Sequence, residues 1–238
     1  MPRFPSASQR APLILERLGE LYPHATCSLD WRTPYELLVA TMLSAQCTDE
    51  RVNRITPALF ERFPDAAAAA AVEAEDVEPY VKSAGFFRNK AKNIVASSRL
   101  LLERHGGEVP RTMEELLELP GVARKTASVV LAWCFGINAG VTVDTHVSRL
   151  AQRLRLTRRS EPRQIEPDLM KLVPQPEWQT LSIRLIFHGR AVCTARSPRC
   201  GACPIADLCP SGEFLSARPV RTAVRTPARS AKAGPAAR

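Results

Sequence analysis

Four cysteines within 17 consecutive residues are the feature that most constrains this chain. Their spacing is C-x6-C-x2-C-x5-C, and the prolines and glycine among them favour a compact, sharply bent loop. Four thiolates held this close repel one another unless a positive centre neutralises them, so the segment predicts a metal site. The expected ligands are Cys193, Cys200, Cys203 and Cys209.

Two kinds of centre fit these ligands, a tetrahedral zinc ion and an iron–sulfur cubane. Structural zinc sites usually contain two C-x-x-C pairs, whereas only Cys200 and Cys203 form one here. The wider spacings suit a cubane, whose iron atoms lie at separate corners. The other three cysteines, Cys27, Cys47 and Cys134, are scattered singly and are expected to be ordinary small side chains.

The expected location of the protein follows from what the sequence lacks. Residues 1–10 contain no apolar stretch typical of a secretion signal, and no apolar run approaches the roughly 18 residues that a membrane span needs. We therefore expect a cytoplasmic protein that does not cross a membrane. Structural disulfides are rare in that compartment, which strengthens the metal interpretation of the cysteines.

Positive charge is concentrated at the C-terminal end of the chain. The formal net charge is +9, and residues 214–238 contain six lysines and arginines but no acidic residue. Prolines and a scarcity of large apolar side chains in this segment predict a flexible basic tail. Such a tail either holds nucleic acid through phosphate contacts or only keeps the protein soluble.

Helix signals recur throughout residues 12–192. Thr33 and Glu36 form a capping box with a proline at the first helical position, and Thr112 and Glu115 form a second box. No pair of alternating, β-branched runs separated by a hairpin turn stands out. Hydrophobic residues make up 45% of the chain, enough to build a buried core. We predict an all-α fold.

A Pro-Gly turn at residues 120–121 joins one capped helix to an apolar run at 129–135, which predicts a helix–hairpin–helix. Backbone amides at the start of the second helix lack partners and can bind a phosphate oxygen. Gly121 permits both the strained backbone and the close approach that such binding needs. Many helical proteins contain Pro-Gly turns, so the turn alone also fits a purely structural role.

Lys125 and Asp144 are the residues best placed for chemistry. Lys125 lies in the first turn after the hairpin, where the macrodipole and partial burial favour an uncharged amine that can form a Schiff base with a sugar carbon. Asp144 stands where another helix begins and could stabilise positive charge that develops on the sugar. The simpler interpretations are a solvated lysine and an ordinary helix N-cap.

Four further basic side chains are candidate contacts to phosphate groups. Arg196 and Arg199 lie inside the cysteine loop, where a metal-bound scaffold would hold both guanidinium groups rigidly. His146 and Arg149 follow Asp144 on the same predicted helix and either reach phosphate or face water.

In combination, these features resemble the endonuclease III family of DNA glycosylases. The resemblance covers roughly residues 10–213 and rests on the cysteine loop together with LPGVARKTA at 119–127, VDTHVSR at 143–149, LSAQCTD at 43–49 and FHGR at 187–190. It implies two helical lobes with DNA across the cleft between them.

The implied domain organisation is discontinuous. A six-helix barrel with the helix–hairpin–helix would occupy residues 27–138. Residues 1–26 and 139–213 would together form a lobe that carries a [4Fe–4S] cluster, and residues 214–238 would form the flexible basic tail.

The resemblance also assigns roles to residues that match the family motifs. Lys125 becomes the nucleophile that attacks C1′ of the damaged nucleotide, and Asp144 the carboxylate that assists it. Gln46 looks like the family's wedge, which fills the gap left by the extruded base, and Phe86 occupies the place of a second, apolar wedge. Arg190, in the FHGR motif, is a further expected DNA contact.

The chain departs from the family pattern at three positions near the expected DNA face. Ala123, which with Gly121 forms the expected phosphate-binding turn, stands where the family usually has a second glycine. A positive φ there would cost an alanine on the order of 1 kcal/mol. Ser197 stands in place of a common lysine in the cysteine loop, and Cys47 in place of a common alanine after the wedge glutamine.

The sequence therefore predicts a bifunctional DNA glycosylase/AP lyase of base excision repair. It would remove oxidised pyrimidines from duplex DNA and cleave the strand 3′ to the abasic site by β-elimination through a lysine Schiff base. The expected partner is damaged double-stranded DNA, and the expected protein is a monomer in the bacterial cytoplasm, associated with the nucleoid. Two alternatives remain, a monofunctional adenine or mismatch glycosylase that activates water and a non-catalytic iron–sulfur DNA-binding protein.

Overall fold

The computed structural model describes residues 4–212, and every regular element in that range is helical. The α-helices are α1 (Ala7–Leu21), α2 (Pro34–Leu43), α3 (Asp49–Arg62), α4 (Ala66–Ala70), α5 (Ala74–Val81), α6 (Phe87–His105), α7 (Met113–Glu118), α8 (Arg124–Phe135), α9 (Thr145–Arg153), α10 (Pro162–Met170) and α11 (Trp178–Ala191). Short 3-10 helices are η1 (Lys82–Ala84), η2 (Gln175–Glu177), η3 (Cys200–Ala202) and η4 (Ala206–Leu208). The predicted all-α fold is confirmed.

The sequence also predicts a basic tail and the absence of a membrane span. The predicted basic tail at 214–238 lies outside the described residues. Within residues 4–212, no helix is both long enough and apolar enough to span a bilayer.

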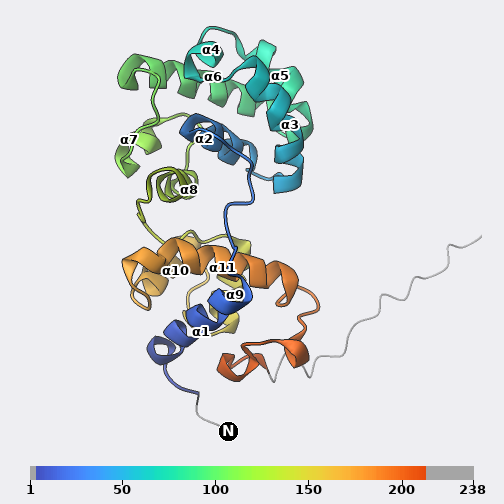
Figure 1. The fold of residues 1–238 in the computed structure, drawn as a ribbon, viewed down its shortest axis with the longest axis vertical. Helices are drawn as coiled ribbons and strands as arrows, with labels where there is room; N and C mark the ends of the chain where they lie inside the picture. Colours follow the sequence, from blue (N-terminus) through green and yellow to red (C-terminus); the bar gives the residue numbers. More distant parts are fainter. Residues whose placement is uncertain (1–3, 213–238) are drawn as a thin grey trace, which may run out of the picture.

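Figure 1 shows two lobes stacked along the long axis of the molecule. The barrel lobe, as we call it, contains α2 to α8, and the cysteine lobe contains α1, α9, α10, α11 and the cysteine loop. The chain passes between them twice, from α1 to α2 and from α8 to α9. Each lobe has its own cluster of buried apolar side chains, so the two lobes are two separate cores joined by short connections.

Helix α2 lies at the centre of the barrel lobe because apolar side chains predominate around it, with Glu36 and Thr41 the polar exceptions. Nine of its ten residues are buried, and Leu37, Leu38 and Leu43 have no exposed surface. Thr33 caps the helix by accepting a hydrogen bond from the backbone N–H of Glu36 at 3.2 Å. The other half of the predicted capping box is wrong, because the Glu36 carboxylate accepts from the backbone N–H of Arg32 at 2.6 Å instead. The helix packs against α3, α6 and α8, and so it fixes the position of the helix that follows the hairpin.

The cysteine lobe is assembled from both ends of the described chain. Helix α1 packs on α11, and α9 packs on both α10 and α11. Leu18 of α1 and Leu150 of α9 are at most 1% exposed. Arg10 of α1 is also buried, and its guanidinium donates to the backbone carbonyls of Leu154 at 2.6 Å and Leu208 at 2.9 Å. This side chain ties α1 to the end of α9 and to the cysteine loop.

Candidate functional site

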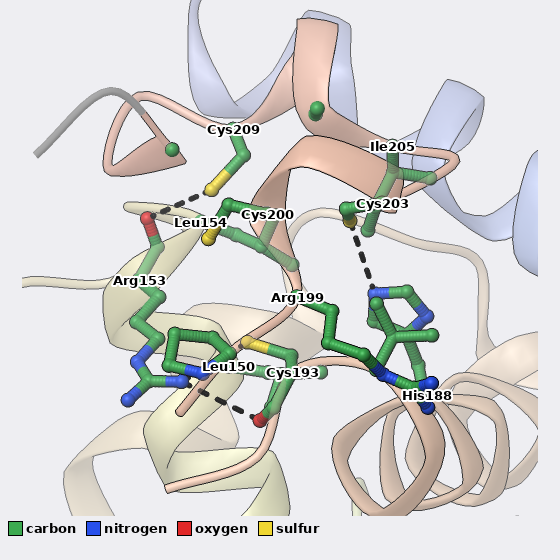
Figure 2. Close-up of a pocket in the computed structure, with 14 residues that line it drawn as sticks. Leu150, Arg153, Leu154, His188, Cys193, Arg199, Cys200, Cys203, Ile205 and Cys209 are labelled. Carbon is green, nitrogen blue, oxygen red and sulfur yellow. Dashed lines mark hydrogen bonds between the residues drawn. The ribbon is translucent and has the colours of Figure 1, made fainter. Parts of the chain in front are cut away.

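The four cysteines of the predicted metal site line one cavity in the cysteine lobe (Figure 2). Cys193 follows α11, Cys200 begins η3, and Cys203 and Cys209 cap the ends of η3 and η4. Within residues 4–212, no three Cys, His, Asp or Glu side chains converge closely enough to hold a single metal ion. Four sulfurs around one cavity, without such convergence, fit a multi-iron cluster better than a zinc ion.

Side chains from α9 and α11 hold the cysteines in position. Arg153 donates from Nη1 to the Sγ of Cys193 at 3.2 Å and to the carbonyl of Thr194 at 2.8 Å. His188 lies with its Nε2 at 3.5 Å from the Sγ of Cys203 (Figure 2). Burial lowers the pKa of His188 to about 4, so the imidazole is neutral and offers one N–H and one acceptor nitrogen.

Two of the four thiols, those of Cys203 and Cys209, resist ionisation in this environment. Burial raises the pKa of Cys203 and of Cys209, and the neighbouring cysteines raise each of them further. A positive centre among the four sulfurs would stabilise the thiolates and reverse this shift. The cavity therefore has the properties of a metal site, because its cysteines need a positive centre to be stable as thiolates.

The two arginines of the cysteine loop differ in what they are free to contact. Arg196 is exposed, and its side chain has no hydrogen-bond or ion-pair partner among the described residues. Arg199 instead donates to the backbone carbonyl of Ala191 and lines the cysteine cavity. Of the two expected phosphate contacts, Arg196 is the one whose guanidinium is not already engaged within the protein.

The hairpin between α7 and α8 has the geometry that the sequence predicts, with one difference. Gly121 has a φ of 80°, and a Cβ there would meet the side chain of Asn93 at 2.6 Å, so glycine is required. Ser97 donates to the carbonyl of Pro120 at 2.7 Å and steadies the turn. Ala123 has a φ of −96° and a ψ of 166°, an extended conformation that any residue adopts. The strain considered for an alanine at this position is therefore absent.

Lys125 and Asp144 lie at the starts of two helices in different lobes. Lys125 is the second residue of α8, but its side chain is exposed, so the expected partial burial is wrong. It has no hydrogen-bond or ion-pair partner within residues 4–212. Asp144 is the N-cap of α9, and its Oδ1 accepts from the backbone N–H of Val147 at 2.8 Å. A cavity of about 490 Å³ lies beside Asp144, but Lys125 does not line it.

Among the described residues, two ion pairs join the lobes. Arg124, next to Lys125, donates to both carboxylate oxygens of Glu166 on α10, at 3.1 and 3.0 Å. The hydrogen bond raises the pKa of Arg124 further above neutrality. No local pattern predicts this pair, because Glu166 lies 42 residues away on a helix without a motif.

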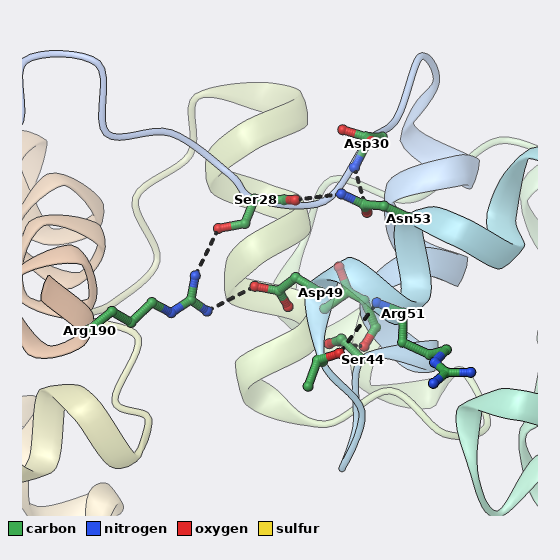
Figure 3. A network of polar contacts seen from close by, with 9 residues as sticks. Ser28, Asp30, Ser44, Asp49, Arg51, Asn53 and Arg190 are labelled. Atoms are coloured by element: carbon green, nitrogen blue, oxygen red, sulfur yellow. Dashed lines mark hydrogen bonds and ion pairs between the residues drawn. The ribbon is translucent and has the colours of Figure 1, made fainter. Parts of the chain in front are cut away.

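The second ion pair involves Arg190, which the sequence predicts to contact DNA. Figure 3 shows its guanidinium reaching from α11 to Asp49 at 2.9 Å and to the Oγ of Ser28 at 3.3 Å. Asp49 begins α3, directly after the loop that carries Gln46. Arg190 thus joins the cysteine lobe to that loop, and a phosphate would have to compete with both of its partners.

His146 and Arg149 are engaged with each other rather than facing water. Arg149 donates to the carbonyls of Cys193 at 3.2 Å and Gly189 at 3.0 Å, and its Nη2 lies 3.1 Å from the Nδ1 of His146. Burial lowers the pKa of both side chains. These residues hold the end of α11 and the first cysteine in place.

Gln46 and Phe86 project from two loops of the barrel lobe. Both have left-handed backbone conformations, with φ of 54° and 47°, which side-chain-bearing residues rarely adopt. Gln46 is exposed, and Phe86 is 67% exposed, so neither side chain belongs to the core. Together with Gly121 they line a cavity of about 200 Å³. The structure thus brings both predicted wedges and the hairpin glycine around one hollow.

Comparisons with known proteins agree with this arrangement. Residues 39–175 match the family described as HhH-GPD superfamily base excision DNA repair protein, and residues 193–209 match the iron-sulfur binding domain of endonuclease III. The chain is 64% identical over 208 residues to Endonuclease III of Synechocystis sp., with 87% of this chain and 95% of that protein covered.

Two solved structures are similar over nearly their whole length. A non-covalent Endonuclease III-DNA complex superposes with a TM-score of 0.84 at 42% identity, covering 89% of this chain and 99% of that one. A trapped Endonuclease III-DNA covalent intermediate superposes with a TM-score of 0.82 at 42% identity, covering 87% of this chain and 97% of that one.

Proposed function

Because this chain belongs to the endonuclease III family, it is a base excision repair DNA glycosylase and AP lyase, and we propose that Lys125 and Asp144 carry its chemistry. The protein binds DNA and an iron–sulfur cluster of the [4Fe–4S] type typical of the family. These findings exclude the zinc interpretation of the cysteines and the interpretation as a non-catalytic protein.

The observation that carries this assignment is the free amine of Lys125 in the first turn after the hairpin. The uncharged Nζ attacks C1′ of the extruded nucleotide, and the bond from C1′ to the base breaks as the base leaves with the electron pair and gains a proton. After the nitrogen has lost a proton, its lone pair forms the C1′=N bond as the C1′–O4′ bond breaks; O4′ takes that electron pair and a proton, so the sugar ring opens and a Schiff base remains at C1′. Removal of a proton from C2′ then expels the 3′ phosphate, which breaks the strand by β-elimination.

Asp144 assists from the opposite lobe. Its Oδ1 is fixed by the N–H of Val147, which orients the carboxylate and leaves Oδ2 to face the sugar. The negative charge stabilises the positive charge that develops on the ring as the base departs. Since Lys125 does not line the cavity beside Asp144, the bound nucleotide itself would bridge the space between the two side chains. DNA that covers Lys125 also excludes water from the reacting atoms.

The residues around the cleft divide into those that touch DNA and those that support them. We assign Gln46 and Phe86 to the gap left by the flipped base, and the amides of the turn at Gly121 and Ala123 to a phosphate. Arg196 contacts the backbone of the duplex. The remaining predicted contacts act mainly by holding the cysteine loop and α11 against the DNA face. They are His146, Arg149, Arg190 and Arg199.

The cluster that Cys193, Cys200, Cys203 and Cys209 would hold supplies rigidity to this surface and takes no part in bond breaking. We further propose the domain division given by the family, with the barrel at 27–138 and the cluster lobe at 1–26 and 139–213. The substrates are oxidised pyrimidines in duplex DNA, and the protein acts as a monomer in the bacterial cytoplasm at the nucleoid.

Borohydride trapping tests the role of Lys125, because reduction of the imine leaves a permanent protein–DNA bond. Wild-type protein is incubated with duplexes containing thymine glycol or an abasic site, with and without borohydride. Lys125→Ala should abolish both the trapped complex and strand cleavage, whereas Lys171→Ala, at an exposed lysine that ends α10, should leave both unchanged. Undiminished trapping by Lys125→Ala would refute the assignment. Base release by wild-type protein without trapping would favour the monofunctional alternative.

A further inference from the structure

One lysine of the barrel lobe is buried with no acidic partner among residues 4–212. Lys90, in the first turn of α6, is 7% exposed. Its Nζ donates to the backbone carbonyl of Leu43 at 2.8 Å and to that of Ala84 at 2.9 Å. Burial lowers the pKa of this amine, and the nearby Cys47 partly offsets the effect. A buried ammonium group is costly to desolvate, so we expect the burial of Lys90 to serve a specific purpose.

Each of its two acceptors ends a helix just before a predicted wedge. Leu43 is the last residue of α2, three positions before Gln46, and Ala84 is the last residue of η1, two positions before Phe86. Carbonyls at helix C-termini lack intrahelical donors and carry partial negative charge. A single ammonium group satisfies both carbonyls, and so it fastens the start of one wedge loop to the start of the other.

The two loops need such a fastening because their conformations are unfavourable. Gln46 and Phe86 both have positive φ, and non-glycine residues hold this conformation only where the surrounding structure enforces it. The loop of Gln46 is anchored at its far end as well, since Arg190 pairs with Asp49 (Figure 3). Lys90 and Arg190 therefore hold this loop from both sides.

We infer that Lys90 is a positioning residue for the opening of the duplex, which sets the spacing of Gln46 and Phe86 so that both enter the base stack together. This inference rests on the proposed wedge function of those two side chains. A direct contact of Lys90 with DNA is disfavoured by its burial and by the two carbonyls that its ammonium group already binds. Its effect on the reaction thus passes through the loops.

The test compares one lesion in two settings. Thymine glycol is placed in a fully paired duplex and in an unpaired loop, where the base is already out of the stack. Lys90→Met keeps the length of the side chain but removes the charge and both hydrogen bonds. Single-turnover base release should fall at least about tenfold on the paired lesion and less than about twofold on the unpaired one. The fluorescence change of 2-aminopurine opposite the paired lesion, which reports opening, should slow in parallel.

Two further variants separate positioning from folding. Lys90→Arg keeps cationic donors and should recover most of the opening rate, and Lys92→Met, at an exposed lysine on the same helix, should behave as wild type. If Lys90→Met does not fold, Lys90→Gln, which keeps a single donor group, takes its place with the same expected preference. In a background that already carries Gln46→Ala and Phe86→Ala, the Lys90 variant should have no further effect on the paired lesion.

An equal loss on both lesions, or no loss on either, would overturn the inference. An additional loss in the double-alanine background would also overturn it, because Lys90 would then act independently of the wedges. Failure of the proposed function gives a different result, since wild-type protein would then not be trapped on an abasic site by borohydride. If wild-type protein is trapped normally but Lys90→Met changes base release by the same factor on the paired and the unpaired lesion, only the role of Lys90 would be refuted.

Discussion

The two lobes differ in what holds them together. The barrel lobe is one continuous stretch of helices around α2, whose side chains are mostly apolar. The cysteine lobe combines α1 with the end of the described chain, and its last segment is a loop with only short helical turns. The first lobe is stabilised mainly by packing, whereas the second also needs its cysteines and arginines.

Arginine side chains, among them the buried Arg10 and the half-buried Arg153, take the place of regular secondary structure in the cysteine lobe. The carbonyls of an irregular loop have no helix or sheet to bond with, and each buried one needs a donor. Arg10 binds the carbonyls of Leu154 and Leu208, and Arg153 binds those of Thr194 and Ala195. The barrel lobe needs fewer such contacts, because its backbone groups are already paired within helices.

Removal of the cluster should show the largest difference between the lobes. Cys203→Ser should destabilise the cysteine lobe by about 4 kcal/mol or more, because the metal centre both neutralises the thiolates and closes the loop. Hydrogen exchange measured by mass spectrometry should show lost protection in α9 and α11 with protection of α2 retained. Cys134→Ser, at a half-buried cysteine of the barrel lobe, is the control. Equal loss of protection in both lobes would mean that they form one cooperative unit.

A matched pair of cavity mutations should sharpen the comparison. Leu38→Ala in α2 and Leu150→Ala in α9 each remove a side chain that is at most 1% exposed, and each should cost about 3 kcal/mol in the intact protein. Once the cluster is removed, the cost of Leu150→Ala should largely vanish while that of Leu38→Ala persists. Urea unfolding of both variants, with and without the cluster, measures the four free energies of unfolding that this comparison needs.

Arg10→Met should have a smaller effect, confined to the cysteine lobe. The change leaves the buried carbonyls of Leu154 and Leu208 without their donor, at a cost of about 2 kcal/mol. Arg17→Met on the same helix breaks a partly exposed ion pair with Asp207 and should cost less than about 1 kcal/mol. Thermal unfolding of the two variants tests which substitution costs more stability. Similar losses of stability would show that burial of Arg10 is unimportant.

The ion pair between Arg124 and Glu166 should have the smallest effect on stability. Glu166→Gln removes its charge, and because Arg124 is half exposed the cost should be about 0.5–1 kcal/mol and should shrink at high salt. Denaturant unfolding at low and high salt measures this dependence. A cost that does not change with salt would indicate that packing between the lobes, rather than charge, is lost in the variant.

Local sequence features identified the parts of the site that local chemistry controls. Cysteine spacing predicted the lining of one cavity, and the Pro-Gly turn predicted the hairpin before α8. Thr33 and Thr112 cap their helices as their neighbours in the sequence suggest. These features depend on residues a few positions apart, so they could be recognised without knowledge of the fold.

Contacts between distant residues were decided only by the tertiary structure. Arg190 pairs with Asp49 across 141 positions, and Arg10 binds the carbonyl of Leu154 across 144, so neither contact could be predicted from spacing. The same holds for Lys90, whose burial no local pattern in the sequence indicates. Whether a cation faces water, a phosphate or a carbonyl depends on which segments the packed core brings beside it, and those segments meet only when the chain has folded.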